Sequence, residues 1–467
     1  MINYKTLRKK HPCFIYESFR WSFKGNDLFM RFRFKLEPNI IFEPKVVVKN
    51  MPPSAKKIPG AVLDNFVFHL GLAEIPSYWK CAVSPSIEIK AGHLNKNQIK
   101  WWKKLLTNGL AEFFYVNHIN PDKMPFQITS TGENNSEILK LIRKKNIKHK
   151  FLVMVGGGKD SLVAIKLVKT AGGEIGTFVL GNVKASISLV KSFHLKPPIK
   201  TQRVIDKKLI ELNKNGYLNG HTPFSSYLAF LSTFCAEVFG YDTVIAGNER
   251  SANEPSMLFN GKKVNHQYSK SYEFEKDFRD YIKKYLTENV NYLSILRPIY
   301  EIQIAKLAAK FTENIGATRS CNVKLKENLW CGKCPKCLSI FLLLYPFLDT
   351  AKLKKMFGEN LFENKKLWSF IPELTGIKTQ KPFECVATRR ENIAALILGY
   401  KKCKNEKKGV PYILRRFHET IEPKAKMNKK NIDDIMNSWN VKNFLPPSLI
   451  AAYSKVAPAT KVSLKKP

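Results

Sequence analysis

The chain has 467 residues and a mass of 53.6 kDa, a length that suggests about three domains. Its 44% hydrophobic and 12% aromatic residues exclude a disordered or fibrous protein. No apolar stretch reaches the ~18 residues of a membrane span, and the first residues contain no apolar signal-peptide segment. We therefore expect a globular, cytoplasmic protein without a membrane span.

The formal net charge of +40 comes mainly from lysine, since only 14 of the 78 basic residues are arginines. Arginine supplies most base-specific and stacking contacts with nucleic acids. The imbalance therefore disfavours a nucleic-acid partner and favours compositional drift, with anionic small-molecule substrates as a further alternative. In each case the field of the protein attracts phosphorylated ligands to a cleft.

Residues 1–145 are predicted to form an α+β domain. The alternation of apolar and polar residues over 28–34 predicts a strand, and the pattern over 95–114 predicts a helix. No motif in this part of the chain indicates a particular chemistry.

A second domain is predicted at 146–350, where strands and helices alternate. We predict strands at 151–155, 175–180 and 243–246, a further strand that ends at 203–205, and helices at 160–170, 184–193 and 224–239. This order is typical of an α/β fold with a doubly wound parallel sheet, in which ligands bind beyond the carboxyl ends of the strands. Residues 351–467 are predicted to be a helical region that ends in a loose, basic tail over 453–467.

The first predicted strand of this domain runs into a glycine-rich loop, Gly156, Gly157, Gly158, Lys159, Asp160 and Ser161. Glycines let backbone N–H groups approach an anion, and the following helix adds its positive end. The Ser161 hydroxyl can bind phosphate, and Asp160 can hold Mg²⁺. The loop is not a Walker A motif, because Asp160 stands where that motif needs Ser or Thr.

The loop resembles that of the N-type ATP pyrophosphatases, or PP-loop enzymes, whose pattern is Ser-Gly-Gly-x-Asp-Ser. Gly156 takes the place of the first serine, which removes one hydroxyl from the pattern. The resemblance implies a fold of the adenine nucleotide alpha-hydrolase type. It also implies cleavage of ATP to AMP and pyrophosphate.

Four of the nine cysteines cluster in the sequence, as Cys321, Cys331, Cys334 and Cys337. Four thiolates at this spacing favour a closed, structural Zn²⁺ site, and the spacing resembles the zinc site of deazaguanine-nitrile synthases. A thiol cluster without metal and an iron–sulfur cluster are the alternatives. The odd number of cysteines, without a signal peptide, argues against a disulfide framework.

A polar stretch over 247–275 follows the strand predicted at 243–246, and we expect it to lie over the nucleotide site. It contains Asn248, Glu249, His266, Lys270 and Glu273. A solvated loop is the simpler interpretation of such a run. His266 is nevertheless a candidate general base, because it stands between polar neighbours and not on an apolar face.

Several longer strings together resemble one family, the UDP-N-acetylmuramoyl-L-alanyl-L-glutamate epimerases of bacterial cell-wall synthesis. They are GGGKDS (156–161), GNERSANEPS (247–256), NHQYSKSYEFE (265–275), LRPIYE (296–301), the string at 319–338 and KPFECVATRRE (381–391). The resemblance implies inversion of the terminal L-glutamate of UDP-MurNAc-L-Ala-L-Glu. It also implies consumption of ATP with Mg²⁺ and release of AMP and diphosphate.

The resemblance also implies roles for individual residues. The loop glycines 156–158 and Ser161 would hold ATP phosphates, Lys159 and Arg319 would stabilise phosphate charge, and Asp160 would position Mg²⁺. Asn248 and Glu249 would lie at the nucleotide. The candidates for proton transfer at Cα are His266 and Cys385, with Lys270 and Glu273 as reserves.

Two other functions are compatible with the same residues. One is a different PP-loop ATP pyrophosphatase, which acts on tRNA or on a small carboxylate as amide and nitrile synthases do. The other is a non-enzymatic zinc protein that binds nucleic acid through its lysines. The sequence indicates no oligomeric state.

Overall fold

The computed structural model describes residues 2–132, 141, 149–407 and 409–457. They form two units, each assembled from segments that are distant in the sequence. The first unit comprises Met1–Leu152, Ile199–Val244 and Leu258–Tyr292, and the second comprises Val153–Pro198, Ile245–Met257 and Leu293–Pro467. The division of the sequence at residues 145 and 350 stays a prediction.

The first unit is built on a mixed sheet. Its strand order is β9 (Ile199–Val204), β4 (Lys45–Val48), β2 (Asp27–Leu36), β1 (Cys13–Lys24), β5 (Ser86–Ile89) and β6 (Gln127–Ser130), and β3 (Ile40–Phe42) pairs with β2. Strands β1 and β2 form an antiparallel hairpin, whereas β5 is parallel to both β1 and β6. Strand β2 buries every second side chain, as its alternating sequence predicts.

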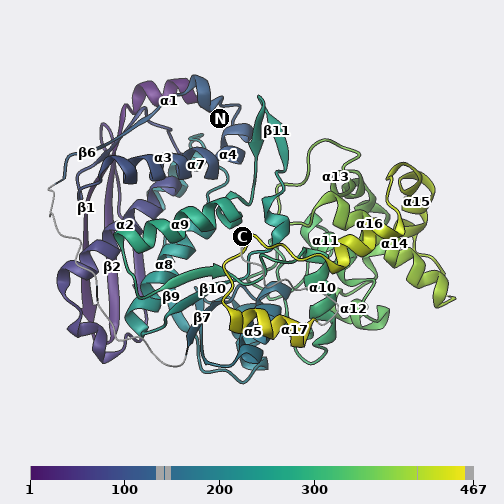
Figure 1. Cartoon of the computed structure of the whole chain (residues 1–467). Coiled ribbons are helices and arrows are strands. Elements are labelled where there is room, and N and C mark those ends of the chain that lie inside the picture. The colour runs from purple at the N-terminus through teal and green to yellow at the C-terminus, as the bar shows by residue number, and fades with distance from the viewer. Residues whose placement is uncertain (1, 133–140, 142–148, 408, 458–467) are drawn as a thin grey trace. The chain divides into compact units, whose positions relative to one another are not determined.

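The inner face of β1 packs on helix α2 (Gly60–Trp79), which is buried along most of its length (Figure 1). The helix predicted over 95–114 is present as two helices, α3 (Lys96–Gly109) and α4 (Ala111–Val116). Asn95 caps α3 and Gln98 completes the capping box. The other elements of this unit are α1 (Tyr4–Lys10), α7 (Lys207–Lys214), α8 (Phe224–Phe239), α9 (Tyr272–Tyr285) and the β11 (Met257–Phe259) and β12 (Lys262–Val264) hairpin.

A second run of strands has the order β13 (Asn291–Ser294), β10 (Thr243–Ala246), β7 (Lys150–Met154) and β8 (Glu174–Leu180). The N–H of Asn291 donates to the carbonyl of Asp242, and the N–H of Ile295 donates to that of Ala246. Both partners advance by four residues in the same direction between these two bonds, so β10 and β13 are parallel. The predicted strands and helices of this part are confirmed, including α5 (Lys159–Ala171) and α6 (Lys184–Ser192). The α/β class is confirmed with them.

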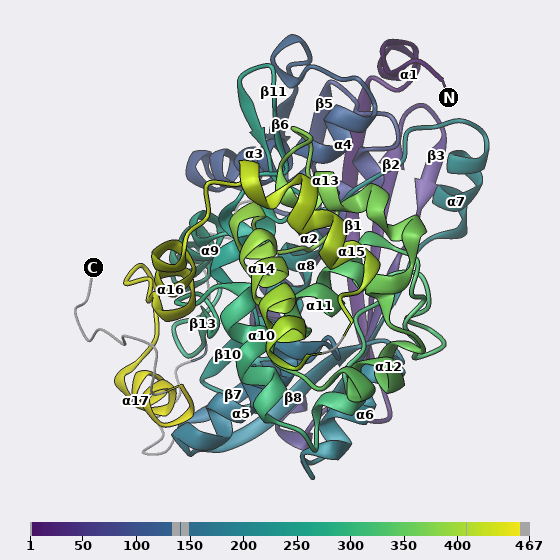
Figure 2. The same ribbon diagram turned by 90° about the vertical axis from the view of Figure 1, so that its right-hand side faces the viewer.

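Helix α5 of the second unit packs on α10 (Glu301–Lys310) and α17 (Pro447–Val456). Figure 2 shows α14 (Arg389–Asn405) with α11 (Pro335–Leu344) and α15 (Tyr412–Thr420), two of the helices that it contacts. The remaining helices are α12 (Thr350–Phe357), α13 (Ile371–Thr375) and α16 (Lys429–Asn437). The helical character predicted after residue 350 is confirmed. None of the helices within the described ranges combines the length and apolarity of a membrane span.

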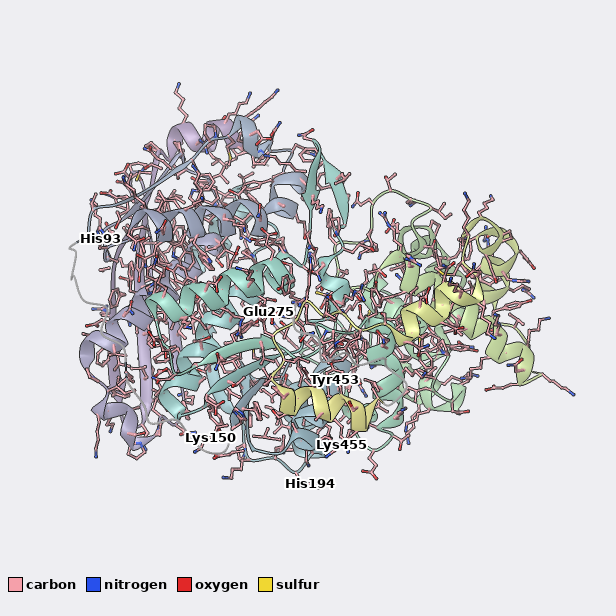
Figure 3. The ribbon with its side chains drawn as sticks, viewed as in Figure 1. His93, Lys150, His194, Glu275, Tyr453 and Lys455 are labelled. Atoms are coloured by element: carbon pink, nitrogen blue, oxygen red, sulfur yellow. The ribbon has the colours of Figure 1, made fainter. Side chains whose placement is uncertain are left out.

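The prediction of a loose tail from residue 453 is wrong for its first residues. Tyr453 lies on α17 (Figure 3) and is fully buried. Its hydroxyl donates a hydrogen bond of 2.7 Å to the carbonyl of Ile295, so the buried ring also satisfies its polar group. The rest of the predicted tail, 458–467, lies outside the described residues.

A buried ion pair ties α2 to β9 in the first unit. The Glu74 carboxylate has no solvent exposure, and the Arg203 guanidinium donates two hydrogen bonds to it, of 2.7 and 2.5 Å. The Arg203 guanidinium also donates to Ser77 and lies over the ring of Tyr227. A bidentate pair of this kind satisfies both buried charges.

Replacement of Glu74 by alanine leaves the Arg203 charge buried without its carboxylate. We expect the free energy of unfolding, measured with urea, to fall by about 3–5 kcal/mol. The matched control is Asp280→Ala, which breaks the exposed Lys276–Asp280 pair on α9 and should cost less than about 0.5 kcal/mol. Equal losses in the two variants would contradict this interpretation of the Glu74–Arg203 pair.

Candidate functional site

The glycine loop has a conformation that glycine alone permits at its centre. Gly157 has a φ of +88°, and a Cβ there would lie 2.7 Å from the Cβ of Ala185 and 2.8 Å from the backbone nitrogen of Ser186. Gly158 is the N-cap residue of α5, and no side chain caps this helix end. Backbone N–H groups at such an end form a ready site for an anion.

The position at which the loop departs from the PP-loop pattern is roomy. A Cβ at Gly156 would have one neighbour within 4 Å, the Ser161 hydroxyl at 3.9 Å. The Ser161 hydroxyl accepts a hydrogen bond of 2.9 Å from the Gly156 N–H, which leaves its proton for another acceptor. No other side chain therefore fills the space that the serine of the PP-loop pattern would occupy at position 156.

The ammonium group of Lys159 lies between the carboxylates of Asp160 and Glu301. Its side chain is 2% exposed, and Nζ lies 2.6 Å from Asp160 Oδ1 and 3.0 Å from Glu301 Oε1. Burial alone lowers the pKa of a lysine, but the charges of Asp160, Glu301 and Glu249 outweigh it and raise the pKa of Lys159. The lysine therefore stays charged, and its contact with phosphate stays a prediction.

Glu301 connects the glycine loop to three other polar strings. The Ser251 hydroxyl accepts from the Glu301 N–H and donates to Glu391, both within 3.0 Å. Glu391 is fully buried, accepts from the Ile302 N–H and from the Thr388 hydroxyl, and so caps the start of α10. Burial and the nearby Glu301 raise the pKa of Glu391.

Buried polar groups hold Asn248 and Glu249, which follow β10, in place. The amide of Asn248 donates to the Ser294 hydroxyl at 3.0 Å. Arg297 has no solvent exposure and donates to the Glu249 carbonyl at 2.8 Å. Asn248 and Glu249 are thus held in place by their surroundings, and their contact with a nucleotide stays a prediction.

The backbone of Arg319 contacts the glycine loop, and the predicted contact of its guanidinium with phosphate stays a prediction. Its backbone N–H donates to the Gly157 carbonyl at 2.8 Å. Its guanidinium donates to the carbonyls of Gly316 and Thr318, and its buried Nε has no hydrogen-bond partner. Burial lowers the pKa of Arg319.

The four clustered cysteines converge as the spacing predicts. The sulfur atoms of Cys321, Cys331, Cys334 and Cys337 lie within 4.8 Å of one another. Those of Cys331 and Cys337 are 3.6 Å apart, close to the separation of about 3.8 Å in a tetrahedron with Zn–S bonds of about 2.3 Å. Hydrogen bonding between the two thiols lowers the pKa of Cys334 and raises that of Cys337, so they titrate as a coupled pair. These residues fit a four-sulfur metal site.

A second polar cluster lies in the first unit. Glu112 on α4, His221 before α8 and His266 after β12 place their ligand-type atoms within 4.8 Å of one another. His266 Nδ1 is hydrogen-bonded to Glu112 Oε2, and His221 Nδ1 is 3.5 Å from the same oxygen. Burial, followed by the charges of His266, Lys80 and Lys270, lowers the pKa of His221 to about 3.

The other candidates for proton transfer have different surroundings. Glu273, at the start of α9, pairs with Lys104 at 2.6 Å, and its side chain is 54% exposed. Cys385 belongs to the second unit, whereas His266, Lys270 and Glu273 belong to the first. The Cys385 carbonyl accepts a hydrogen bond from Lys336. Their roles in proton transfer stay predictions.

Sequence reasoning did not single out Glu112, Ser251, Glu301 or Glu391. The last three lie inside the polar strings at 247–256, 296–301 and 381–391, so the strings themselves were the available signal. Glu112 lies on the short helix α4, and no sequence motif marks it as a functional residue.

Comparisons with known proteins identify the family of the chain. The MurL N-terminal domain matches residues 5–295, and the MurL C-terminal domain matches residues 317–431. A UDP-N-acetyl-alpha-D-muramoyl-L-alanyl-L-glutamate epimerase of Xanthomonas oryzae pv. oryzae is 30% identical over 380 residues, which cover 80% of this chain and 82% of that protein.

A protein of the same name from Salinispora tropica is 30% identical over 352 residues, which cover 74% of this chain and 75% of that protein. A third, from Micromonospora sp., is also 30% identical over 352 residues, covering 74% and 77%. No solved structure matches the chain. The two matched domains together span most of the sequence, and the chain therefore belongs to the MurL family.

Proposed function

We propose that this protein inverts the terminal L-glutamate of UDP-MurNAc-L-Ala-L-Glu to D-glutamate, a step in the synthesis of a peptidoglycan precursor. The names of the three relatives support this substrate and reaction. We further propose that the inversion consumes ATP, which is cleaved to AMP and diphosphate at a PP-loop site. The glycine loop at the start of α5 is the single observation that carries this second part.

Activation of the carboxylate explains why an inversion would need ATP. A free carboxylate makes the neighbouring Cα–H a poor acid, because removal of the proton places a second negative charge beside the first. Adenylation neutralises the carboxylate and supplies an electron-withdrawing acyl phosphate. A base can then remove the proton, a donor returns one on the other face, and hydrolysis releases the product.

The residues of the second unit fit ATP and Mg²⁺. The glycines 156–158 and the uncapped end of α5 offer backbone N–H groups to phosphate, and Ser161 retains a proton to donate. The Asp160 side chain is 33% exposed, so its carboxylate can still reach a cation while Lys159 beside it is buried. Bound Mg²⁺ would neutralise phosphate charge during adenylation.

We also propose that Cys321, Cys331, Cys334 and Cys337 hold a structural Zn²⁺. Four sulfurs leave no open coordination position, so the site would stabilise the segment after Arg319 and take no part in the reaction. The N–H groups of Lys324, Lys333 and Cys337 each donate to a sulfur at 3.4 Å, as is usual around metal thiolates.

The substrate assignment is tested with the purified protein, UDP-MurNAc-L-Ala-L-Glu, ATP and Mg²⁺ in deuterated water. We expect AMP, diphosphate and a D-glutamyl product that carries deuterium at Cα, all dependent on ATP. Mass spectrometry and chiral analysis of the glutamate give the readout. AMP without Cα exchange would move the function to acyl or amide transfer, and the absence of AMP would contradict the substrate assignment.

The loop offers a matched pair of variants. Gly157→Ala forces a Cβ into Ala185 at a φ of +88°, and we expect kcat/KM for AMP formation to fall by roughly 100-fold or more. Gly156→Ala adds the same methyl group in open space and should change kcat/KM by less than about fivefold. Equal effects of the two substitutions would contradict the assigned loop geometry.

The zinc site is tested by elemental analysis of dialysed protein. We expect about one equivalent of zinc per chain and its loss in the Cys331→Ser/Cys334→Ser double variant. Cys13→Ser, a substitution of a half-buried cysteine in the first unit, is the control and should retain the metal. Iron in place of zinc, or equal zinc contents in both variants, would overturn the assignment.

A further inference from the structure

Three basic residues form a row across the sheet of the first unit, which we call the cation row. Arg20 of β1 is directly opposite Arg31 of β2, and Arg31 is directly opposite Lys45 of β4. Neighbouring strands lie about 4.8 Å apart, so the three residues follow one another at that spacing. Like charges in directly opposite positions destabilise a sheet. The sheet therefore carries an energetic cost at this place that its own packing does not explain.

The cation row lies on the face of the sheet that helix α2 does not cover. A Cβ at Gly71 of α2 would lie 2.9 Å from Cδ1 of Phe32, so Phe32 faces this helix. Successive side chains of a strand point to opposite faces, and Arg31 therefore points away from α2. Arg20 and Lys45 share its face because they are its cross-strand partners. Both are exposed and Arg31 is half-buried, so a ligand in solution can reach the row.

Other charges on this sheet are neutralised, in contrast to those of the cation row. Arg33 forms ion pairs with Glu17 at 2.8 Å and with Glu43 at 3.0 Å. Lys49 pairs with Asp27 at 2.6 Å. Within the ranges that the structure describes, no carboxylate forms an ion pair with a member of the cation row. The three positive charges are therefore available to an anion from outside.

A hollow opens beside the cation row. It is lined by residues 18–20 of β1, residues 31–33 of β2 and Glu43, so both arginines of the row belong to its wall. Its volume is about 250 Å³, slightly below the roughly 300–1,000 Å³ of typical small-molecule sites. The register of β1 against β2 shifts between Tyr16 and Ser18, at one end of this wall. Such bulges redirect side chains and are frequent beside binding sites. The hollow suits a compact anion.

Charge and extent together favour a diphosphate group. The row presents its three charges over about 10 Å, two strand spacings. Carboxylates border it along the strands, those of Glu17 and Glu43 on one side and that of Asp27 on the other, and they disfavour a long polyanion such as a nucleic acid. A diphosphate carries its negative charge on two joined phosphates, so neighbouring arginines can each bind phosphate oxygens.

We propose that the cation row binds the diphosphate group of a small ligand, either free diphosphate or a nucleoside diphosphate. This inference concerns the first unit alone and does not depend on the proposed function. Arg20 and Arg31 donate to phosphate oxygens from two neighbouring strands, and Lys45 adds its charge beside Arg31. The bound anion removes the repulsion within the row, so binding also stabilises the folded sheet.

Modification of arginines with phenylglyoxal gives a readout confined to this site. The full chain is treated at fixed ionic strength with and without inorganic diphosphate, and peptide mass spectrometry measures each modified arginine. We expect diphosphate to slow the modification of Arg20 and Arg31 by about fivefold or more. Arg415, an exposed arginine on α15, is the internal control and should react at the same rate in both samples.

Substitutions separate the cation row from the general field of a protein with a net charge of +40. The concentration of diphosphate that half-protects Arg20 should rise about tenfold or more in Arg31→Gln and in Lys45→Gln. Lys35→Gln removes the same charge from β2 outside the row and should change this concentration by less than about threefold. Circular dichroism verifies that each variant is folded.

Three further ligands distinguish the sources of the diphosphate group. UDP should half-protect Arg20 within about threefold of the concentration of inorganic diphosphate, and orthophosphate should need about tenfold more. Orthophosphate that protects as well as diphosphate would contradict the inference, and so would a single-stranded oligonucleotide that protects at lower concentration than UDP. Unchanged modification with diphosphate, or equal shifts in Arg31→Gln and Lys35→Gln, would also overturn it. Because the readout is local to Arg20, none of these outcomes depends on AMP formation at the glycine loop.

Discussion

An ammonium group with almost no access to solvent lies at the start of α5, and the arrangement around the glycine loop depends on it. The carboxylates of Asp160 and Glu301 offset the cost of burying the Lys159 charge. Glu301 in turn begins α10, whose first turn is capped by the buried Glu391. The loop is therefore held by charges and hydrogen bonds that also fix the neighbouring helix.

This network explains why the polar strings of the sequence are far apart yet belong together. The strings at 156–161, 247–256, 296–301 and 381–391 each contribute a group to it, namely Lys159, Ser251, Glu301 and Glu391. A buried ion pair of this kind is weak as a source of stability, because desolvation offsets much of the attraction. Its value is geometric, since the hydrogen bonds through Ser251 and Glu391 fix how the segments that they join are arranged.

Sequence patterns predicted the local elements of this fold well, but they did not predict which distant side chains meet. The helix predicted at 224–239 and the strand predicted at 243–246 agree with α8 and β10 to the residue, because periodicity and flanking glycines are local signals. The buried end of α17 was missed because the Tyr453 partner is a backbone carbonyl 158 residues away. Glu112 was missed because His266 lies 154 residues further along the chain. The cysteine cluster was found because three of its members are close in sequence.

We propose that the α-carboxylate of the terminal glutamate attacks ATP, because inversion at Cα requires activation of the neighbouring carboxyl group. This proposal is tested most directly with a substrate labelled with ¹⁸O in that carboxylate. Adenylation forms a bond from a carboxylate oxygen to phosphorus, and hydrolysis at the acyl carbon leaves this oxygen on the phosphate. We expect AMP that carries one ¹⁸O atom in each turnover. Unlabelled AMP during continued inversion would contradict it.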